Sequence, residues 1–161
     1  MAKKLKLNPD VAYMLGIYSY SGCDAIGVLS KEEAVTSKFL RLAMEHYGIE
    51  PTKVLFESTE NGQMAYFYNS KLQKLFDKTL ERKAVVFKYK NDYSAAYFAA
   101  IFDEKGSKGS RQYCLEGLKP DDALILERLG FHASWKNKRA YIKNGVSFIE
   151  FIKPFSAKFA Q

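Results

Sequence analysis

Two almost wholly apolar segments, each closed by a glycine, stand at matched places in the chain. The first covers residues 11–20 and ends at Gly22, and it follows Asn8-Pro9-Asp10, which favour a helix start by capping and charge. The second covers residues 93–104 and ends at Gly106. A helix that is apolar on all its faces is buried. The pattern therefore predicts two buried helices.

The segments after each buried helix follow one order in both halves. A short extended piece comes first, then an amphipathic helix, a hairpin and a closing helix. In the first half these are predicted at 24–29, 30–47, 53–68 and 71–81, with Ser30 as the side-chain cap of its helix; in the second half they are predicted at 111–115, 120–129, 131–143 and 146–155. The ordered match indicates an internal duplication, against the alternative that short α/β segments all look alike.

The duplication divides the chain into a first repeat at 8–82, a linker at 83–90 and a second repeat at 91–161. The linker contains an apolar run at 84–87 that suits either a strand or an ordered connection. The net charge of +7 is uneven, because residues 1–82 carry 11 Lys or Arg and 10 Asp or Glu, whereas residues 83–161 carry 14 and 8. A basic half indicates a polyanionic partner, although charge also serves solubility.

Several classes of site are disfavoured by the remaining residues. Cys23 and Cys114 show no metal-ligand spacing, and two free thiols suit a reducing cytoplasm. His46 and His132 stand alone, so no catalytic triad or Cys/His pair is supported. No apolar run approaches the roughly 20 residues of a membrane span, and the N-terminus lacks the apolar region of a signal peptide. We therefore expect a cytoplasmic protein without a membrane partner.

The two glycine-terminated helices, Met14 to Gly22 and Phe98 to Gly106, resemble the motif helices of the LAGLIDADG homing endonucleases in their single-chain form. The resemblance implies an α+β fold of two pseudo-symmetric αββαββα halves, with the motif helices packed at a pseudo-twofold axis. It also implies a monomer that carries the symmetry of a dimer within one chain. Gly16 and Ala100 fall where the helix backbones must approach closely, and both motif helices are followed by short gaps, so the first hairpin of each half is shortened.

In this family the acid just before each terminal glycine holds a divalent metal. The equivalent positions here are Ser21 and Lys105, and neither supplies the hard anionic oxygen that Mg²⁺ prefers. The resemblance therefore implies degenerate catalytic positions, and we expect no cofactor. Asp24, Asp103 and Glu104 are nearby acids that would need to rescue a Mg²⁺ site if the protein cleaves DNA.

Candidate DNA-binding cations lie in or beside the predicted hairpins and after the second motif: Lys53, Lys108, Arg111, Lys136, Lys138, Arg139 and Lys143. Such side chains contact phosphates and supply affinity rather than sequence reading. Tyr66 and Tyr141 occupy matched positions before the closing helices, which favours a core role for both. Arg139 and Lys143 alternate with Tyr141, so a regular strand places all three on one side, in conflict with that core role.

The leading hypothesis is a non-catalytic protein that binds duplex DNA, derived from a homing endonuclease and suited to a regulatory role. One alternative is an active Mg²⁺-dependent endonuclease or nickase that uses displaced acids. A second alternative is an RNA-binding or protein-interaction module on the same scaffold.

Overall fold

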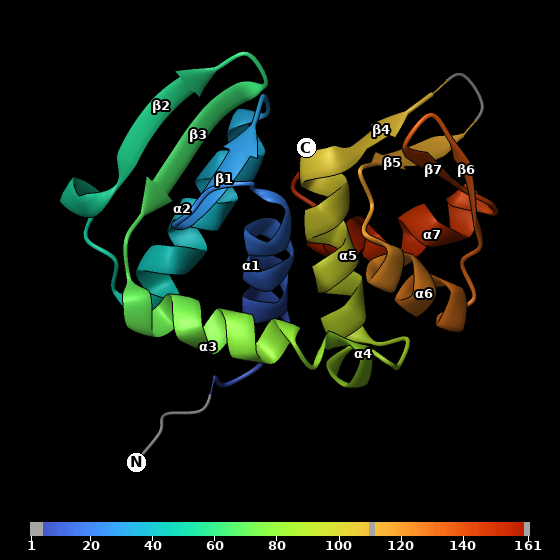
Figure 1. Cartoon of the computed structure of the whole chain (residues 1–161), viewed down its shortest axis with the longest axis horizontal. Coiled ribbons are helices and arrows are strands. Elements are labelled where there is room, and N and C mark those ends of the chain that lie inside the picture. The colour runs from blue at the N-terminus through green and yellow to red at the C-terminus, as the bar shows by residue number, and fades with distance from the viewer. Residues whose placement is uncertain (1–4, 110–111, 160–161) are drawn as a thin grey trace.

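The computed structural model describes residues 5–109 and 112–159 of the chain (Figure 1). The first half consists of α1 (Pro9–Tyr20), β1 (Ile26–Ser30), α2 (Glu33–Tyr47), the 3₁₀ turn η1 (Pro51–Lys53), β2 (Leu55–Thr59), β3 (Gly62–Phe67) and α3 (Ser70–Leu80). A short helix, α4 (Lys83–Val86), connects it to the second half. The second half consists of α5 (Asp92–Lys105), β4 (Gly106–Lys108), β5 (Tyr113–Glu116), α6 (Pro120–Arg128), β6 (Ala133–Lys136), β7 (Arg139–Ile142), α7 (Gly145–Ile152) and η2 (Lys153–Phe155).

The two glycine-terminated helices, α1 and α5, lie side by side at the centre of the molecule, with one sheet on each side (Figure 1). Gly16 makes this contact possible. A Cβ atom at Gly16 would lie 2.5 Å from the Tyr97 carbonyl oxygen and 2.7 Å from the Ala100 Cβ atom. The missing side chain therefore lets the two backbones touch, and buried residues of both halves form one continuous hydrophobic cluster.

Both sheets are antiparallel and follow a related strand order. The first sheet is β1-β3-β2 and the second is β4-β5-β7-β6. In register, Ala65 and Phe67 of β3 face the helices, as do Ala140 and Ile142 of β7. The halves are thus consistent with a duplication in which β1, β2 and β3 correspond to β5, β6 and β7. The strand β4 has no counterpart, so the first half has no initial hairpin.

Local sequence explains the ends of the helices. The Asn8 side chain accepts a hydrogen bond from the Val11 amide (2.9 Å), and Asn91 forms a capping box with Ser94 at the start of α5. Gly48 closes α2 in the left-handed conformation, at φ +62°. These three ends confirm the pattern-based helix boundaries.

Four local expectations were wrong or incomplete. Ser30 ends β1 and does not cap α2, which begins at Glu33 without a side-chain cap. The linker at 83–90 contains a helical turn instead of a strand, and it is anchored by the buried Phe87 ring, which stacks on Tyr97 at 4.3 Å between centroids. The short hairpin β4–β5 agrees with the shortened first hairpin expected in the second half, whereas the first half has the single strand β1 in place of a hairpin.

The fourth correction concerns Tyr66 and Tyr141, which are not core residues. Their neighbours on each strand face the helices, so both tyrosines lie on the opposite face of their sheets, which we call the open face. Arg139 shares that face with Tyr141, which removes the conflict between the two sequence-based expectations. Among the helices of the described residues, none is long and apolar enough to cross a membrane.

Candidate nucleic-acid interface

The two central helices end beside each other, at the positions where the family resemblance places its metal-binding acids. Ser21 is buried, and its hydroxyl donates to the Tyr18 carbonyl of its own helix (3.3 Å). Lys105 is the last residue of α5 and is half-buried. The next residue is Gly106, where a Cβ atom would lie 2.2 Å from the Phe102 ring. Glycine at this position therefore lets the Phe102 ring pack directly against the backbone where α5 passes into β4.

Asp103 serves as an internal anchor. It is buried at 1% exposure, and its carboxylate accepts hydrogen bonds from the Tyr13 hydroxyl (2.6 Å) and the Ala157 amide (2.7 Å). It also accepts from the Ser156 hydroxyl and from the Lys158 amide (3.4 Å). Both carboxylate oxygens are therefore engaged, and Asp103 fixes the last described residues of the chain against α5.

Glu104 differs from Asp103 because only one of its oxygens has a partner. Its Oε2 accepts from the Leu29 amide of β1 (3.1 Å), whereas Oε1 is buried with no hydrogen-bond partner among the described residues. Burial raises the pKa of the Glu104 carboxyl well above 4.5, and Asp103 raises it further; the Leu29 amide and Lys105 act in the opposite direction. Through the Leu29 amide, Glu104 links α5 of the second half to β1 of the first half.

Asp24 is exposed beyond the end of α1, and its backbone carbonyl accepts from the Gln73 side chain (2.9 Å). Burial raises the pKa of the neighbouring Cys23 thiol, and the charges of Asp24, Glu104 and Glu57 raise it further, whereas the Ala25 amide acts in the opposite direction. Within residues 5–109 and 112–159, no group of three or more His, Cys, Asp or Glu side chains is arranged to hold a metal ion. At the two positions that directly precede the terminal glycines, Ser21 and Lys105 supply no carboxylate.

A cleft of about 600 Å³ opens at these helix ends. Its lining includes Leu29 and Asn61 from the first half and Gly106 and Ser107 from the second. The charged residues in its wall are four lysines and four acids: Lys31, Lys105, Lys138, Lys158, Glu32, Asp103, Glu104 and Glu116. Asp103 and the Oε1 atom of Glu104 are buried, so the acids that face solvent in the cleft are chiefly Glu32 and Glu116, beside the four lysines.

The open face of the second sheet carries three of the predicted cations. Arg139 and Lys136 are paired across β7 and β6 and are exposed, and they share the face with Tyr141. Lys143 follows β7 by one residue and is also exposed. Lys138 lies in the tight turn between the two strands, at φ +64°, and reaches the cleft instead. These four residues form one basic region on the second half.

The other predicted cations lie elsewhere. Lys108 pairs with Tyr113 and lies over its ring, 5.8 Å from the centroid, on the helix-facing side of β4. Lys53 is exposed at the end of η1, before the outer strand of the first sheet. Arg111 lies outside the described residues. The structure therefore does not bring the predicted set together as one site.

Sequence reasoning missed two lysines of the cleft. Lys31 directly follows β1, in the turn that leads to α2. A cation in such a turn is a sequence signal for a residue at the end of a sheet. Lys158 carries no such signal. Its ammonium donates to the Gly106 carbonyl (2.7 Å) and lies 5.3 Å from the centroid of the Phe102 ring. Only the tertiary contact with α5 reveals its position.

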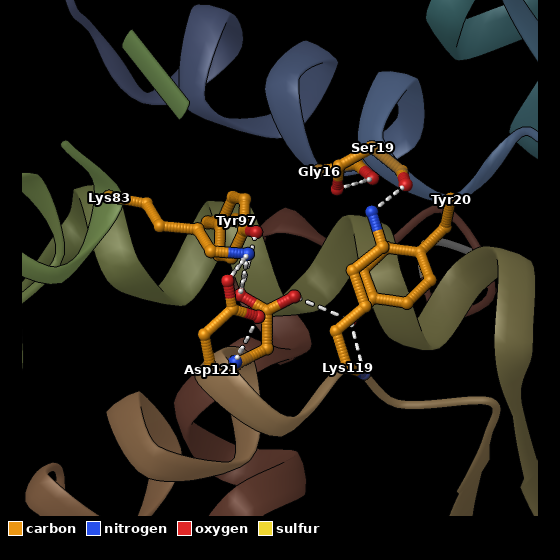
Figure 2. Close-up of polar contacts among 8 residues, drawn as sticks. Gly16, Ser19, Tyr20, Lys83, Tyr97, Lys119 and Asp121 are labelled. Atoms are coloured by element: carbon orange, nitrogen blue, oxygen red, sulfur yellow. Dashed lines mark hydrogen bonds and ion pairs between the residues drawn. The ribbon is translucent and has the colours of Figure 1, made fainter. Parts of the chain in front are cut away.

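A buried polar network joins the central helices on another side of the molecule (Figure 2). At its centre is Asp122 of α6, which is fully buried and accepts from the Tyr20 hydroxyl (2.5 Å) and the Tyr97 hydroxyl (2.8 Å). Lys83 of α4 neutralises it at 3.1 Å and also contacts Asp121 at 3.0 Å. Burial raises the pKa of both tyrosines, which keeps them as hydrogen-bond donors.

The two histidines take no part in either region. His46 pairs with Asp10 at 2.9 Å, and His132 lies 3.8 Å from Glu127 on an exposed surface. His46 belongs to α2, and His132 lies between α6 and β6. Neither lines the cleft. They match the expectation of isolated histidines.

Comparison with known proteins finds similarity in structure alone. No family model and no curated protein matches the sequence. The homing endonuclease I-DmoI in complex with DNA and Mn is 14% identical, at a TM-score of 0.68 over 95% of this chain and 97% of that chain. The complex with DNA and Ca is also 14% identical, at 0.65 over 91% and 88%. Mesophilic variants of I-DmoI are 14% identical as well, at 0.67 over 89% and 94%.

I-DmoI is a single-chain LAGLIDADG homing endonuclease with two domains. The similarity extends over most of both chains, and it includes the two central helices and the two flanking sheets described above. At 14% identity, the similarity shows the fold alone. The chain therefore has the fold of the LAGLIDADG homing endonucleases, as its two glycine-terminated helices indicated.

Proposed function

We propose that the protein binds duplex DNA without cleaving it. The observation that carries the proposal is the composition of the cleft at the ends of α1 and α5. A serine bonded to its own helix and a lysine stand where the family resemblance places two metal-binding acids. Four lysines, Lys31, Lys105, Lys138 and Lys158, line the cleft together with the exposed acids Glu32 and Glu116 and the inward-lying Asp103 and Glu104.

The chemistry of this cleft suits a phosphate group better than a metal ion. Ammonium groups attract the phosphodiester backbone, and each phosphate neutralised releases counterions, so binding weakens as salt rises. The basic open face of the second sheet, with Lys136 and Arg139, extends the same attraction outward. DNA-bound structures of I-DmoI, which share this fold, support duplex DNA as the partner.

The protein would work without a bound metal and would act by occupying a site rather than by cutting it. That mode of action is suited to a regulator. Phosphate contacts give affinity and orientation, whereas base-edge contacts give sequence discrimination. The short first sheet and the short β4-β5 hairpin leave few side chains for reading bases, so we propose modest sequence preference.

Fluorescence anisotropy with a labelled duplex, titrated across a salt series, tests the binding. We expect affinity at low salt and a linear fall of log K with log salt. Lys136→Gln and Arg139→Gln should each reduce the magnitude of the slope of log K against log salt by about 1. Lys71→Gln, an exposed lysine on α3, is the matched control and should leave the line unchanged. No binding at low salt would refute the proposal.

A Mg²⁺- or Mn²⁺-dependent nickase is a second candidate, and the partnerless Oε1 of Glu104 favours it. Incubating supercoiled plasmid with each metal discriminates the two. If nicked product forms with the wild type and disappears in Glu104→Gln but persists in Asp24→Asn, the protein is a nuclease and our proposal of a non-cleaving protein is wrong.

A further inference from the structure

The open face of the first sheet differs sharply from that of the second. Strands β1, β2 and β3 contain no Lys or Arg, and their one charged residue is Glu57, which is exposed. By register, Glu57 lies opposite Met64 on this face, and Leu55 lies opposite Tyr66. A surface of this composition offers no attraction to a phosphate backbone, and its carboxylate repels one.

What this surface does offer is exposed ring and apolar area. Tyr68 is 71% exposed and Leu55 is 45% exposed. The Tyr66 and Tyr68 rings lie 5.9 Å apart and at 88° to each other, and Met64 is half-buried beside them. We call Leu55, Met64, Tyr66 and Tyr68 the tyrosine face.

The tyrosine face is continuous with the basic cleft. Leu29 of β1 lies opposite Met64 in the sheet register, and Leu29 also lines the cleft that contains Lys31 and Lys105. In Figure 1 the first sheet lies on one side of α1 and α5 and the second sheet lies on the other. A ligand held by the basic region of the second half can therefore extend through the cleft onto the tyrosine face.

A duplex and an unpaired strand meet this surface differently. A duplex presents charged phosphates outward and keeps the faces of its bases stacked within the helix. An unpaired strand exposes base faces that stack on aromatic side chains, with little dependence on sequence. Charge complementarity therefore assigns the duplex to the basic half, and the exposed rings favour unpaired bases on the tyrosine face.

We propose that the ligand is a nucleic acid in which a duplex continues into an unpaired strand, with the duplex on the basic second half and the bases of the strand stacked on Tyr66 and Tyr68. This inference rests on the proposed function, since it needs the duplex to bind the second half. It goes further by naming a junction as the preferred ligand and by giving the first half a separate task.

Anisotropy with three labelled probes of equal phosphate count tests the inference: a blunt duplex, a duplex with a single-stranded extension, and a single strand. We expect the extended duplex to bind about tenfold more tightly than the blunt one, which corresponds to one stacked base. Because stacking is not ionic, that gain should persist as salt is raised. The same set made of RNA shows whether the sugar alters the preference.

Variants separate the two surfaces. Tyr68→Ala should abolish most of the affinity gained from the single-stranded extension and leave blunt-duplex affinity unchanged. Because Tyr68 is exposed, the substitution should not prevent folding. Tyr66→Phe should retain the gain, because the ring remains. Tyr89→Ala, an exposed tyrosine of the linker, is the matched control.

The outcomes distinguish the two proposals. If the blunt and extended duplexes bind equally, or if Tyr68→Ala leaves the gain intact, the junction inference is wrong while duplex binding stands. If neither probe binds at low salt, the proposed function itself fails.

Discussion

The two halves of the molecule share a buried plan and differ in the surface they present. In both, a glycine-terminated helix lies under a sheet in which an alanine and a larger apolar residue of the central strand face the core: Ala65 and Phe67 in one, Ala140 and Ile142 in the other. Outside that core the first sheet has one acidic residue, a half-buried Tyr66 and an exposed Tyr68, whereas the second carries an extra strand and exposed cations.

The comparison shows which positions a duplicated fold can vary. Tyr13 of α1 and Tyr97 of α5 are both almost fully buried. Their hydroxyls nevertheless donate to different acids, Asp103 and Asp122. Packing restricts the type of side chain inside the core, and the surface is free to take on separate tasks. The same scaffold can therefore present a basic region and an aromatic region within one chain.

The largest expected effect concerns the network in Figure 2, which ties the halves together. Asp122→Ala leaves the Lys83 ammonium without its buried anion and two tyrosine hydroxyls without their acceptor, so we expect a loss of about 4 kcal/mol in the free energy of unfolding. Asp121→Ala removes an exposed partner of the same lysine and should cost about 0.5 kcal/mol. Urea denaturation of both variants measures the difference, and equal losses would contradict the assignment.

Gly16 offers the next largest effect. Gly16→Val places side-chain atoms within 3 Å of the Tyr97 carbonyl and the Ala100 Cβ, so the two central helices must separate, at a cost of about 3 kcal/mol. Val146→Ala, at a 71% exposed position of α7, is the control and should change stability by about 0.5 kcal/mol or less. Thermal unfolding followed by circular dichroism checks both. A near-neutral Gly16→Val would mean that α1 and α5 are not in direct contact.

Adding a cation to the neutral sheet would reduce the contrast between the halves. Glu57→Lys replaces the one carboxylate of the first sheet's strands with an ammonium on an exposed edge strand. We expect blunt-duplex affinity to rise by about tenfold at low salt and the salt dependence to steepen. Glu60→Lys, in the nearby turn, makes the same charge change off the sheet face. A gain that is equal in both variants would show that net charge, and not the face, sets the affinity.

The smallest effect is a pH dependence at Glu104. Because burial raises the folded-state pKa, the folded protein holds the proton more tightly than the unfolded chain, and stability falls as pH rises from the unfolded value near 4.5 through the folded pKa. Asp103 and Lys105 are the charged neighbours that act on it. Glu104→Gln should remove this decline and stabilise the protein at neutral pH by about 1 kcal/mol. Melting temperatures of both proteins across the acidic range test it, and parallel curves would contradict it.

Much of the fold could be predicted because local signals and tertiary structure agree. The all-round apolar helices, the capping Asn8 and Asn91, the left-handed Gly48 and the Asn61-Gly62 turn each specify their element with neighbouring residues alone. Ser30 misled because it ends β1, and its hydroxyl accepts from the Glu32 amide ahead of α2 (2.9 Å) rather than from an amide within the helix. The tyrosines at 66 and 141 misled because repeated aromatics suggest a core, whereas strand register decides which face they occupy.

The site was less accessible to sequence reasoning. Ser21 and Lys105 are identified by the glycines that follow them, but the cleft also depends on Lys31 and Lys158, which lie far apart in sequence. Asp103 and Glu104 are adjacent in the chain and acidic alike. Only the contacts of the folded protein separate an anchor with four hydrogen bonds from a carboxyl with one unpartnered oxygen.

The position of Lys83 has a consequence for building hybrid proteins from this scaffold. The lysine belongs to the connection between the halves, yet its counter-ion, Asp122, belongs to α6 of the second half and accepts a hydrogen bond from Tyr20 of the first. A chimera that exchanges one half for that of a related protein must therefore carry Tyr20, Lys83 and Asp122 as a matched set. Recombination points on either side of the connection are not equivalent, since a junction after Lys83 separates the cation from the acid it evolved to neutralise.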